Sequence, residues 1–434
     1  MNRRAVVGGV LLTGGVVYLG FLVERTASVA VIGGYSVAFL GYGLVWGSGG
    51  LRRLLVLGVL LRVVLVFGFP RLSDDVYRFI WDGTLLNEGH NPFRELPAHY
   101  LEEDNAVPGL TPELYGNLNS PEYYTIYPPV AQAVFTAATW LSPTDWYWSS
   151  VWMKLFLLGC ELGTLWLLLR LLPRLGDRGE GPVLLYWLNP LIIVEITGNL
   201  HFEGAMVCFL LLALYWLTDH RWARAGAAMG LSVASKLLPL LLLPYLLRRF
   251  FHRGVRPFWI FSGLLGGVLL LSFLPLVASG FLEGFGSSLD LYFRKFEFNA
   301  SLYYLARAYG YYEVGWNQIA RFGPLLAAAA ATGILLLAGI DRRTDWPSLP
   351  EGWLFAFLLY LLCATTVHPW YLAVPLVLSC FTRWRFVVVW SWLICFTYVS
   401  YATDPYREHL WIVAAEYLTV AGVAVWEWRR ARTL

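Results

Sequence analysis

Two adjacent carboxylates, Asp74 and Asp75, have the residue types and spacing for acid–base chemistry in this 434-residue chain. They open a polar stretch, residues 72–132, between very apolar segments. A carboxylate at the wet mouth of a membrane cleft stays ionised and can remove the proton of a hydroxyl group. We therefore interpret at least one of the pair as a general base. The structural alternative is that one of them caps the first turn of a helix over residues 76–86.

Polar side chains at the ends of other apolar segments are candidates for binding a polar ligand. His201 and Glu203 lie at a turn between two such segments, where ionisable residues are costly; they either bind a ligand and buttress the aspartates or only stabilise the turn. Lys236, one of three lysines in the chain, either holds a phosphate group or snorkels to the membrane surface. His368 with Trp370 suits a sugar-phosphate site or an interfacial belt.

The remaining candidates are basic, aromatic and amide side chains for which ligand-binding and structural interpretations both stay open. We expect them to contact a sugar or a lipid phosphate, or else to pack a loop or cap a helix. They are Arg78, Tyr127, Arg294, Lys295 and Asn299.

The composition indicates an all-α polytopic membrane protein. Hydrophobic residues make up 58% and charged residues 14%, and the mean hydropathy is +0.57. The apolar runs reach the roughly 20 residues that a helix needs to cross a bilayer. The net charge of +3 does not indicate nucleic acid as a partner, and the five cysteines show no metal-ligand spacing.

We expect a bundle of about 13 to 14 transmembrane helices. With basic turns placed in the cytoplasm, both termini are cytoplasmic and the long loops face outward, in a cell (inner or plasma) membrane. The expected spans lie near residues 5–23, 29–46, 54–69, 151–172, 182–197, 203–218, 222–235, 237–250, 257–279, 324–340, 351–366, 369–382, 386–402 and 409–427.

The chain, residues 1–434, forms a single membrane domain in this interpretation. Residues 70–150 make a first outer loop with interfacial helices, and residues 280–323 make a second. The charge pattern requires that residues 127–141 lie at the surface instead of spanning the membrane. Arg62 and Glu161, each in the middle of an expected span, are predicted to form a structural ion pair, which offsets the cost of burying both.

Four short motifs give the chain a family resemblance. At residues 74–78, 81–83, 91–93 and 127–129 it resembles bacterial mannosyltransferase-like members of the GT-C superfamily of glycosyltransferases. The catalytic subunit of GPI mannosyltransferase I is similar at a greater distance. The resemblance implies a GT-C-like helical bundle, a sugar donor linked to polyprenyl phosphate, an acidic base in the first large outer loop, and inversion at the anomeric carbon.

Carried onto this chain, the resemblance places Asp74 or Asp75 at the base, with a slight preference for Asp75, and Lys236 at a phosphate-binding lysine. The expected reaction transfers a hexose, with mannose favoured, to a hydroxyl of a glycolipid, polysaccharide or other acceptor. No cofactor is expected, although adjacent aspartates leave a divalent ion as an alternative. The rival function is a transporter or flippase of lipid-linked sugars, for which paired repeats and broken helices are typical.

Overall fold

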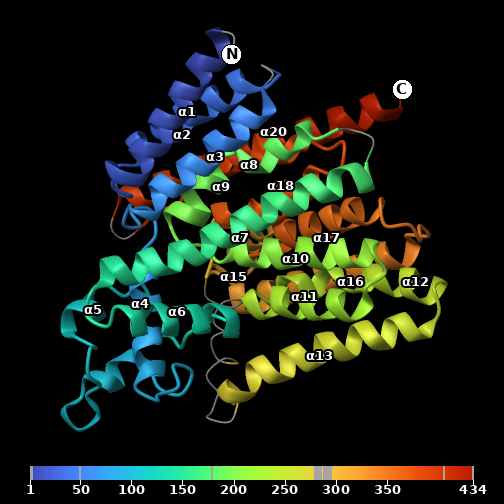
Figure 1. Cartoon of the computed structure of the whole chain (residues 1–434). Coiled ribbons are helices and arrows are strands. Elements are labelled where there is room, and N and C mark those ends of the chain that lie inside the picture. Colours follow the sequence, from blue (N-terminus) through green and yellow to red (C-terminus); the bar gives the residue numbers. More distant parts are fainter. Residues whose placement is uncertain are drawn as a thin grey trace.

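The computed structural model describes residues 3–47, 50–176, 179–277, 286, 296–403 and 406–432. Every regular element within these ranges is helical, which confirms the all-α prediction. One isolated parallel bridge, between Phe298 and Thr366, joins two loops. The composition of the helices makes this a multi-pass membrane protein (Figure 1).

The first half of the chain contains fourteen consecutive helical elements, of which η4 is π-helical and the other η elements are 3-10 helices. They are α1 (Arg3–Phe21), α2 (Ser28–Val45), α3 (Leu51–Val66), α4 (Asp75–Asn87), η1 (Pro97–Leu101), η2 (Glu103–Asn105), α5 (Pro112–Gly116), α6 (Pro129–Leu141), α7 (Trp146–Leu175), η3 (Gly181–Val183), α8 (Leu184–Trp187), α9 (Pro190–Ile192), η4 (Ile193–Gly198) and α10 (Glu203–Thr218).

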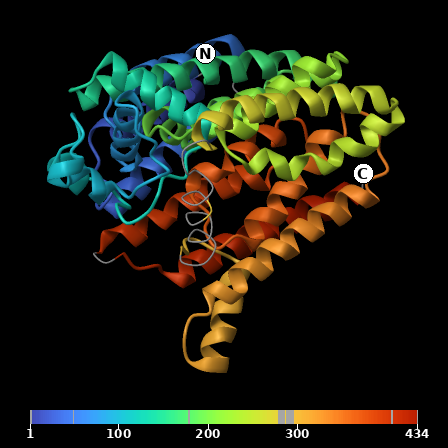
Figure 2. The same cartoon turned by 90° about the horizontal axis from the view of Figure 1, so that it is seen from below.

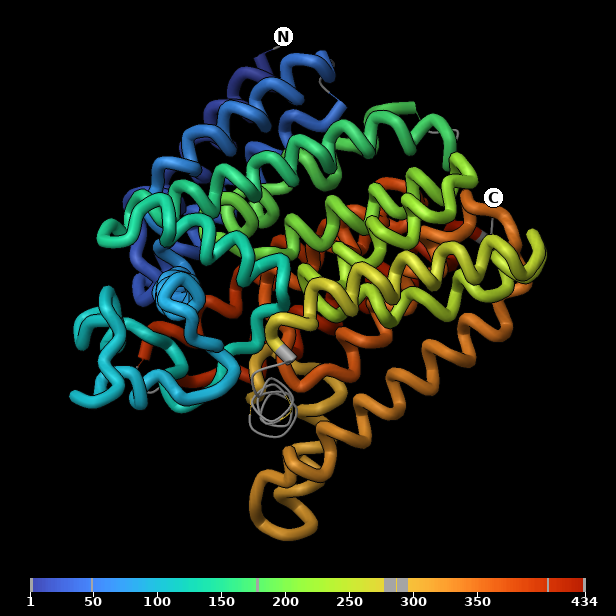
Figure 3. Tube along the Cα trace, turned by 60° about the horizontal axis from the view of Figure 1, so that its bottom comes forward, coloured from blue at the N-terminus to red at the C-terminus, as the bar shows by residue number. Residues whose placement is uncertain are grey.

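The second half contains longer helices interrupted by 3-10 segments. They are α11 (Trp222–Ser235), η5 (Leu238–Leu242), α12 (Pro244–His252), α13 (Val255–Val277), α15 (Leu302–Val314), α16 (Ile319–Ile340), α17 (Leu349–Cys363), η6 (Pro369–Leu372), α18 (Ala373–Ser379), α19 (Phe386–Leu393), η7 (Ile394–Ala402) and α20 (Leu410–Arg432). The hairpin of α15 and the start of α16, in orange, projects from the other helices in Figures 2 and 3.

Fewer helices than expected are long enough to cross a bilayer. Within the described ranges, α1, α2, α7, α13, α16 and α20 meet the length and hydropathy requirement. A bent pair of helices raises the number to at most seven. The prediction of about 13 to 14 spans is not met by helix length, because several expected spans are apolar helices of 10–17 residues, shorter than the roughly 20 that a straight crossing needs. Proline and polar breaks shorten them.

The bent pair is a broken helix that the sequence analysis did not foresee. Residues Gly181–Trp187 and Pro190–Gly198 meet at an angle of 44°. Asn189 lies at the break, and its side-chain oxygen accepts a hydrogen bond from the backbone N–H of Leu191. Asparagine before proline favours such a break, since proline disfavours helical backbone in the residue before it. The second limb runs into η4 and leads directly to His201.

The polar stretch between the first spans folds as a separate group of short helices at one end of the bundle. In Figure 1, α4, α5 and α6 lie together at the lower left. The predicted helix over residues 76–86 is confirmed as α4, and α6 has only 13 residues. At 1.5 Å per residue, α6 is about 20 Å long, too short to span, which agrees with its predicted surface position.

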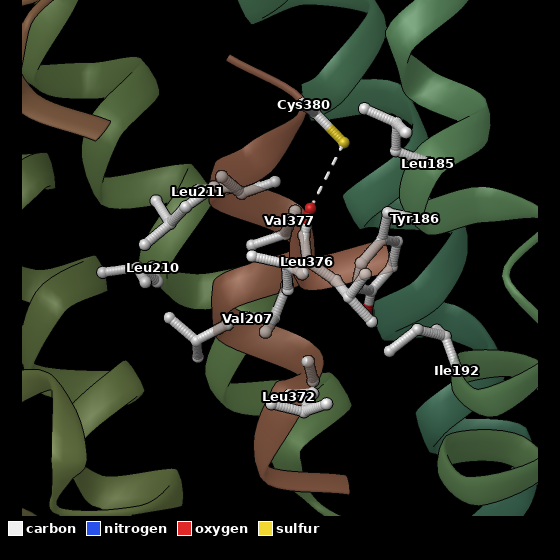
Figure 4. Close-up of a cluster of buried hydrophobic side chains, with 14 of the residues drawn as sticks. Leu185, Tyr186, Ile192, Val207, Leu210, Leu211, Leu372, Leu376, Val377 and Cys380 are labelled. Atoms are coloured by element: carbon white, nitrogen blue, oxygen red, sulfur yellow. Dashed lines mark hydrogen bonds between the residues drawn. The ribbon is translucent and has the colours of Figure 1, made fainter. Parts of the chain in front are cut away.

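The core between these elements is built from close-packed aliphatic side chains. Figure 4 shows one part, where side chains from α8, α9, α10, η6 and α18 interdigitate, and the thiol of Cys380, directly after α18, donates to the carbonyl of Leu376 at 3.6 Å. All residues labelled there are buried. The helices that carry polar residues to the site therefore rest on a tightly packed interior, which holds their ends in fixed positions.

The predicted ion pair between Arg62 on α3 and Glu161 on α7 is confirmed. Two guanidinium nitrogens of Arg62 donate to Glu161 Oε2 at 2.8 and 3.0 Å, and both side chains are fully buried. Tyr186 donates to the second oxygen of Glu161 at 2.7 Å, and Arg62 also donates to the carbonyl of Trp187 at 2.9 Å. This network joins α3, α7 and α8, and it supports a structural role.

Candidate active site

The two aspartates at the start of α4 have different partners. Asp74 occupies the N-cap position, but its side chain makes no capping hydrogen bond and pairs instead with Arg25 from the turn between α1 and α2. Asp75 Oδ1 accepts a hydrogen bond from the amide of Asn119 at 2.7 Å, and Oδ2 lies 3.8 Å from His201 Nε2. The capping interpretation is therefore wrong for Asp74, since a tertiary ion pair takes up its carboxylate.

Arg25 neutralises one carboxylate of the pair. Its guanidinium also lies over the ring of Tyr401, 4.7 Å from the centroid, which fixes its direction. Asp75, by contrast, is held by a neutral amide, and its side chain is 18% exposed. The two neighbours therefore differ in their pairing and not in access: the Asp74 side chain is 37% exposed but belongs to an ion pair with arginine, whereas Asp75 is held by an amide.

A lysine–glutamate pair joins the start of α10 to the end of α11. Glu203 begins α10 and is buried, and Lys236, directly after α11, donates to its carboxylate. The ammonium group also lies 4.6 Å from the centroid of the Tyr371 ring. Since the Lys236 side chain is 30% exposed, an anionic ligand can reach the ammonium group.

Two histidines and a tryptophan form a parallel stack beside this pair. The ring of Trp370 lies 3.6 Å from that of His201 and 4.5 Å from that of His368, with interplanar angles of 13° and 7°. Phe298 extends the stack at 4.9 Å from His368. The sequence suggested that His368 and Trp370 form a sugar-phosphate site or an interfacial belt, and in the structure Trp370 lies parallel to two imidazoles.

The stacked histidines present nitrogen atoms that lack a protein partner. His201 Nε2 and His368 Nδ1 are buried and accept or donate no hydrogen bond among the described residues. Burial, and then the nearby charge of Lys236, lowers the pKa of His368 to about 3. His368 is therefore neutral near pH 7, so one ring nitrogen remains able to accept a hydrogen bond.

Tyr127 and Arg78 lie on the α4 side of the same region but differ in what they contact. Tyr127 packs on Phe79, with ring centroids 4.8 Å apart. Burial, and then the charge of Asp75, raises the pKa of Tyr127 well above its usual value, so its hydroxyl stays a hydrogen-bond donor. Arg78 is buried and donates to Asp82 at 2.8 Å and to the carbonyl of Tyr123 at 2.9 Å, which ties the loop to α4.

The structure does not bring every candidate to this place. Asn299 is fully buried, with its side chain donating to Glu416 at 3.1 Å and its backbone N–H to Glu408. It does not cap the next helix, because Ser301 holds that position before α15. Arg294 and Lys295 lie outside the residues that the structure describes.

The sequence analysis missed several residues that complete the site. Arg25 and Asn119 left no local signal, because each reaches the aspartates across more than 40 positions of the chain. Glu195 carried a usable signal as a carboxylate inside an apolar run, which marks a functional candidate in a membrane protein. Tyr35 and Tyr398 donate to it from α2 and η7, and this is visible only in three dimensions.

The geometry defines a class of site. A partly exposed carboxylate, Asp75, lies beside His201, and a partly exposed ammonium, Lys236, acts on His368, and the two imidazoles stack on Trp370. Such a site can accept a proton from a hydroxyl and bind an anion such as phosphate. Among the described residues, no three His, Cys, Asp or Glu side chains gather as metal ligands. The protein is thus a multi-pass membrane protein with a mixed acidic and basic site at one end of its bundle.

Comparison with known proteins gives the family. The family model described as "Alpha-(1->6)-mannopyranosyltransferase, N-terminal domain" matches residues 6–251, more than half of the chain. The chain belongs to this family, which confirms the expected resemblance to polyprenyl-phosphate-mannose-dependent transferases of the GT-C superfamily.

Individual relatives are similar at low identity. Alpha-(1->6)-mannopyranosyltransferase A of Mycobacterium tuberculosis is 23% identical over 330 residues, covering 73% of this chain and 62% of the relative. Its namesake from Corynebacterium glutamicum is 25% identical over 186 residues, covering 42% and 36%. Alpha-(1->6)-mannopyranosyltransferase B of the same bacterium is 23% identical over 145 residues, covering 33% and 23%. The chain therefore covers less than two thirds of the length of each relative.

Proposed function

We propose that this protein transfers mannose from a polyprenyl-phosphate-linked donor to a hydroxyl group of a glycolipid, polysaccharide or other acceptor at the outer face of the membrane. The family description and the names of the relatives support mannose as the transferred sugar and an α-(1→6) linkage in the product. The helix composition supports a donor that reaches the site from the bilayer. Inversion at the anomeric carbon gives an α linkage from a β-linked donor.

Asp75 is the general base in this proposal. The observation that carries the assignment is the different pairing of the two aspartates, since Arg25 neutralises Asp74 while Asp75 has no arginine or lysine partner among the described residues. Asn119 holds one oxygen of Asp75 at 2.7 Å and leaves the other to face the site. Asp75 removes the acceptor proton as the acceptor oxygen attacks C1, and the bond from C1 to the phosphate oxygen breaks.

Lys236 binds the departing lipid phosphate. Its ammonium group is paired with the buried carboxylate of Glu203 when no donor is present. The phosphate of the donor competes with this carboxylate for the ammonium group. The negative charge on the leaving oxygen grows in the transition state, so a fixed cation stabilises the transition state more than the bound substrate. His368 contributes a neutral imidazole beside Lys236. Arg294 and Lys295 remain further candidates for this role from the sequence alone.

Tyr127 contacts the sugar in the same proposal, and His201, which is 3% exposed, buttresses Asp75. The Tyr127 hydroxyl stays protonated and offers a hydrogen bond to a sugar oxygen. Arg78 acts indirectly, because its contacts with Asp82 and the Tyr123 carbonyl hold the loop that carries Tyr127. Asn299 has a structural role in this proposal. Its buried side chain donates to Glu416, which supports the loop that packs against His368.

The experiment measures transfer of radiolabelled mannose from polyprenyl phosphate mannose to a membrane lipid extract. Asp75→Asn is expected to lower kcat by roughly 100-fold or more, the usual contribution of a general base. Asp74→Asn, the matched control, is expected to lose far less, because it removes only a charge already paired with Arg25. Equal rates for Asp75→Asn and the wild type contradict the assignment.

A transporter or flippase of lipid-linked sugars is the second candidate, and the broken helix over residues 181–198 is the observation in its favour. The same assay separates the two functions. A transporter moves labelled donor across proteoliposomes without forming a product in which mannose has left the lipid phosphate. Product formation that depends on Asp75 establishes the transferase.

A further inference from the structure

His201 lies between two carboxylates, and the proposed function uses only one of them. Its Nε2 is 3.8 Å from Asp75 Oδ2, and its Nδ1 is 3.3 Å from Glu195 Oε2 and 2.9 Å from the Glu195 backbone carbonyl. The imidazole is 3% exposed, and Glu195 is fully buried. A carboxylate, an imidazole and a second carboxylate thus follow one another from the site into the protein interior.

Glu195 is held by several hydrogen-bond donors. Tyr35 and Tyr398 both donate to Oε1, and the amide of Asn199 lies 3.4 Å from Oε2. With Nδ1 of His201, donors from three separate parts of the chain converge on one carboxylate. Such convergence satisfies the oxygen atoms of a buried carboxylate, which are costly to bury without hydrogen-bond partners.

The local backbone fixes the direction of the imidazole. Glu195 lies within the π-helical segment η4, and Leu200 has a φ of +65°, a conformation rare for residues other than glycine. This turn brings His201 back over the start of η4, so its Nδ1 reaches the Glu195 carbonyl. The Trp370 ring, 3.6 Å from the imidazole, prevents rotation. A strained backbone conformation of this kind persists only where contacts with the surrounding structure hold it in place.

The hydrogen bonds indicate which nitrogen carries the proton in the resting protein. Nδ1 faces two acceptor oxygens of Glu195 and therefore donates to them. In a neutral imidazole this leaves the lone pair of Nε2 directed at Asp75. Nε2 is buried and has no hydrogen-bond partner among the described residues. Nε2 of His201 therefore lacks a donor as long as Asp75 is ionised. Once Asp75 is protonated, its O–H can donate a hydrogen bond to Nε2.

We propose that His201 takes up, on Nε2, the proton that Asp75 removes from the acceptor hydroxyl, with Glu195 stabilising the imidazolium that forms. The inference rests on the proposed function. The acceptor O–H bond breaks and Asp75 becomes a carboxylic acid; its O–H then donates to Nε2 and transfers the proton, which restores the Asp75 carboxylate. The imidazolium next releases this proton to water or to the departing phosphate, so protons and charge balance over the cycle.

This arrangement gives His201 a positioning role that acts through Asp75. Without His201, Asp75 stays protonated beside the departing phosphate. The next turnover then requires a water molecule to remove the proton from Asp75. Glu195 has the part of the carboxylate in a serine-protease triad, where the buried acid fixes the tautomer of histidine and stabilises its charged form. The analogy concerns geometry only, since here the group served is another carboxylate.

The test compares two substitutions of His201 in the full-length protein. His201→Gln places an amide near Nε2 that donates a hydrogen bond to Asp75 but takes up no proton. We expect kcat to fall by about 100-fold while KM for both substrates stays within threefold. His201→Ala is expected to regain rate with added imidazole and to respond far less to 1,2,4-triazole, which has a similar shape but is much less basic.

Each outcome either supports the inference or overturns it. A kcat for His201→Gln within threefold of wild type shows that no proton acceptor is needed there. A low rate for His201→Gln without imidazole rescue of His201→Ala assigns the residue to packing alone, which also overturns the inference. Both results differ from failure of the proposed function, in which the wild type transfers no mannose or Asp75→Asn keeps full activity.

A second observation, independent of the first, concerns a groove of about 530 Å³ at the other end of the bundle. It lies between α17, the start of α19 and the end of α20, and Phe355, Trp384 and Trp428 form much of its wall. Arg383 and Arg343 lie at its polar end. Arg343 is paired with Asp341 and Glu351, whereas Arg383 has no ion pair within the described part of the chain.

We infer that this groove binds an anionic phospholipid, with an acyl chain along the apolar wall and the phosphate at Arg383. The charge is complementary, because the basic turns give this end a positive potential that attracts anionic headgroups. Tryptophans at the rim suit the depth of lipid headgroups. The occupant is a bilayer lipid and not the sugar donor, since the groove lies at the opposite end of α17 from the loop that bonds to Phe298.

The thermal unfolding midpoint in detergent tests this inference with phosphatidylglycerol as the probe. We expect phosphatidylglycerol to raise Tm of the wild type more than phosphatidylcholine does, and Arg383→Gln to lose at least half of the difference. Arg52→Gln, at an exposed arginine of another basic turn, is the matched control. We expect it to keep the full difference in Tm between the two lipids. Equal shifts with both lipids, an equal effect of inorganic phosphate, or an equal loss in Arg52→Gln each overturn the lipid site.

Discussion

Asp74 and Asp75 show how two identical, adjacent side chains acquire different chemistry. Arg25 removes the charge of one, and Asn119 holds the other without neutralising it. The pattern of two acids at the start of a helix was readable in the sequence, but the choice between them was not. That choice depends on a turn some 49 positions earlier in the chain, and no local pattern encodes it.

The Arg25–Asp74 pair predicts a cycle of substitutions. Arg25→Gln leaves the Asp74 carboxylate unpaired beside the site, where it repels an anionic donor, so we expect KM for the donor to rise several-fold. The double variant Arg25→Gln/Asp74→Asn removes both charges and is expected to restore the wild-type KM. Initial rates against donor concentration measure this. A KM in the double variant as high as in the single one contradicts the electrostatic explanation.

His368 predicts a pH dependence of stability. Its folded-state pKa of about 3 lies below the ordinary 6.5, so between these values the unfolded chain binds more protons than the folded one. Stability from this residue is therefore present above pH 6.5 and is lost as the pH falls, by at most about 1.4 kcal/mol per pH unit. His368→Phe, which keeps the stack, is expected to reduce the drop in Tm between pH 7 and pH 5. His252→Gln, at an exposed histidine, should leave it unchanged.

At the scale of elements, the contact between α4 and α6 decides where the aspartates lie. Gly83 on α4 lies so close to α6 that a Cβ atom there would be 2.5 Å from the carbonyl oxygen of Phe135 and 2.7 Å from Thr139 Oγ1. Only glycine permits this approach, because backbone atoms cannot move aside as a flexible side chain does. The position of α4, and with it Asp75, therefore depends on a residue without a side chain.

Gly83→Ala is accordingly expected to destabilise the protein by about 1–3 kcal/mol, the usual cost of overpacking. It should also lower mannose transfer, since α4 must shift away from α6. Gly116→Ala on α5, where a new Cβ meets nothing within 4 Å, is the matched control. Thermal unfolding and initial rates, measured on both variants, test this. Wild-type stability for Gly83→Ala refutes the close contact.

Some elements were predictable from sequence because their physical cause is local. Helix α4 begins at its acids, α6 begins at Pro129 and is too short to span, and the Arg62–Glu161 pair follows from the cost of buried charge. Fewer helices than expected reach the length of a straight crossing, since hydropathy does not reveal where a helix breaks. The bend over residues 181–198 had a local signal in Asn189 before Pro190, which the sequence analysis did not use.

At the scale of the whole molecule, the prediction is one of topology. Basic turns at Arg342 and Arg343 are expected in the cytoplasm, and the loop carrying Asn119 and Ser120 outside. In intact cells a membrane-impermeant thiol reagent should label Ser120→Cys, whereas Arg342→Cys should react only after permeabilisation. The wild type serves as the control, because four of its five cysteines are buried. Labelling of Arg342→Cys in intact cells would contradict the proposed orientation and indicate the opposite one.

The stack on His201 joins two parts of the chain that lie far apart in sequence. The match to the N-terminal-domain model ends at residue 251, yet the ring packed on His201 is Trp370, and Tyr398 reaches Glu195 from further on. The first part thus supplies the acid and the imidazole, and the second part sets their surroundings. A substitution at Trp370 or Tyr398 can therefore alter the setting of His201 while every residue of the first part stays the same.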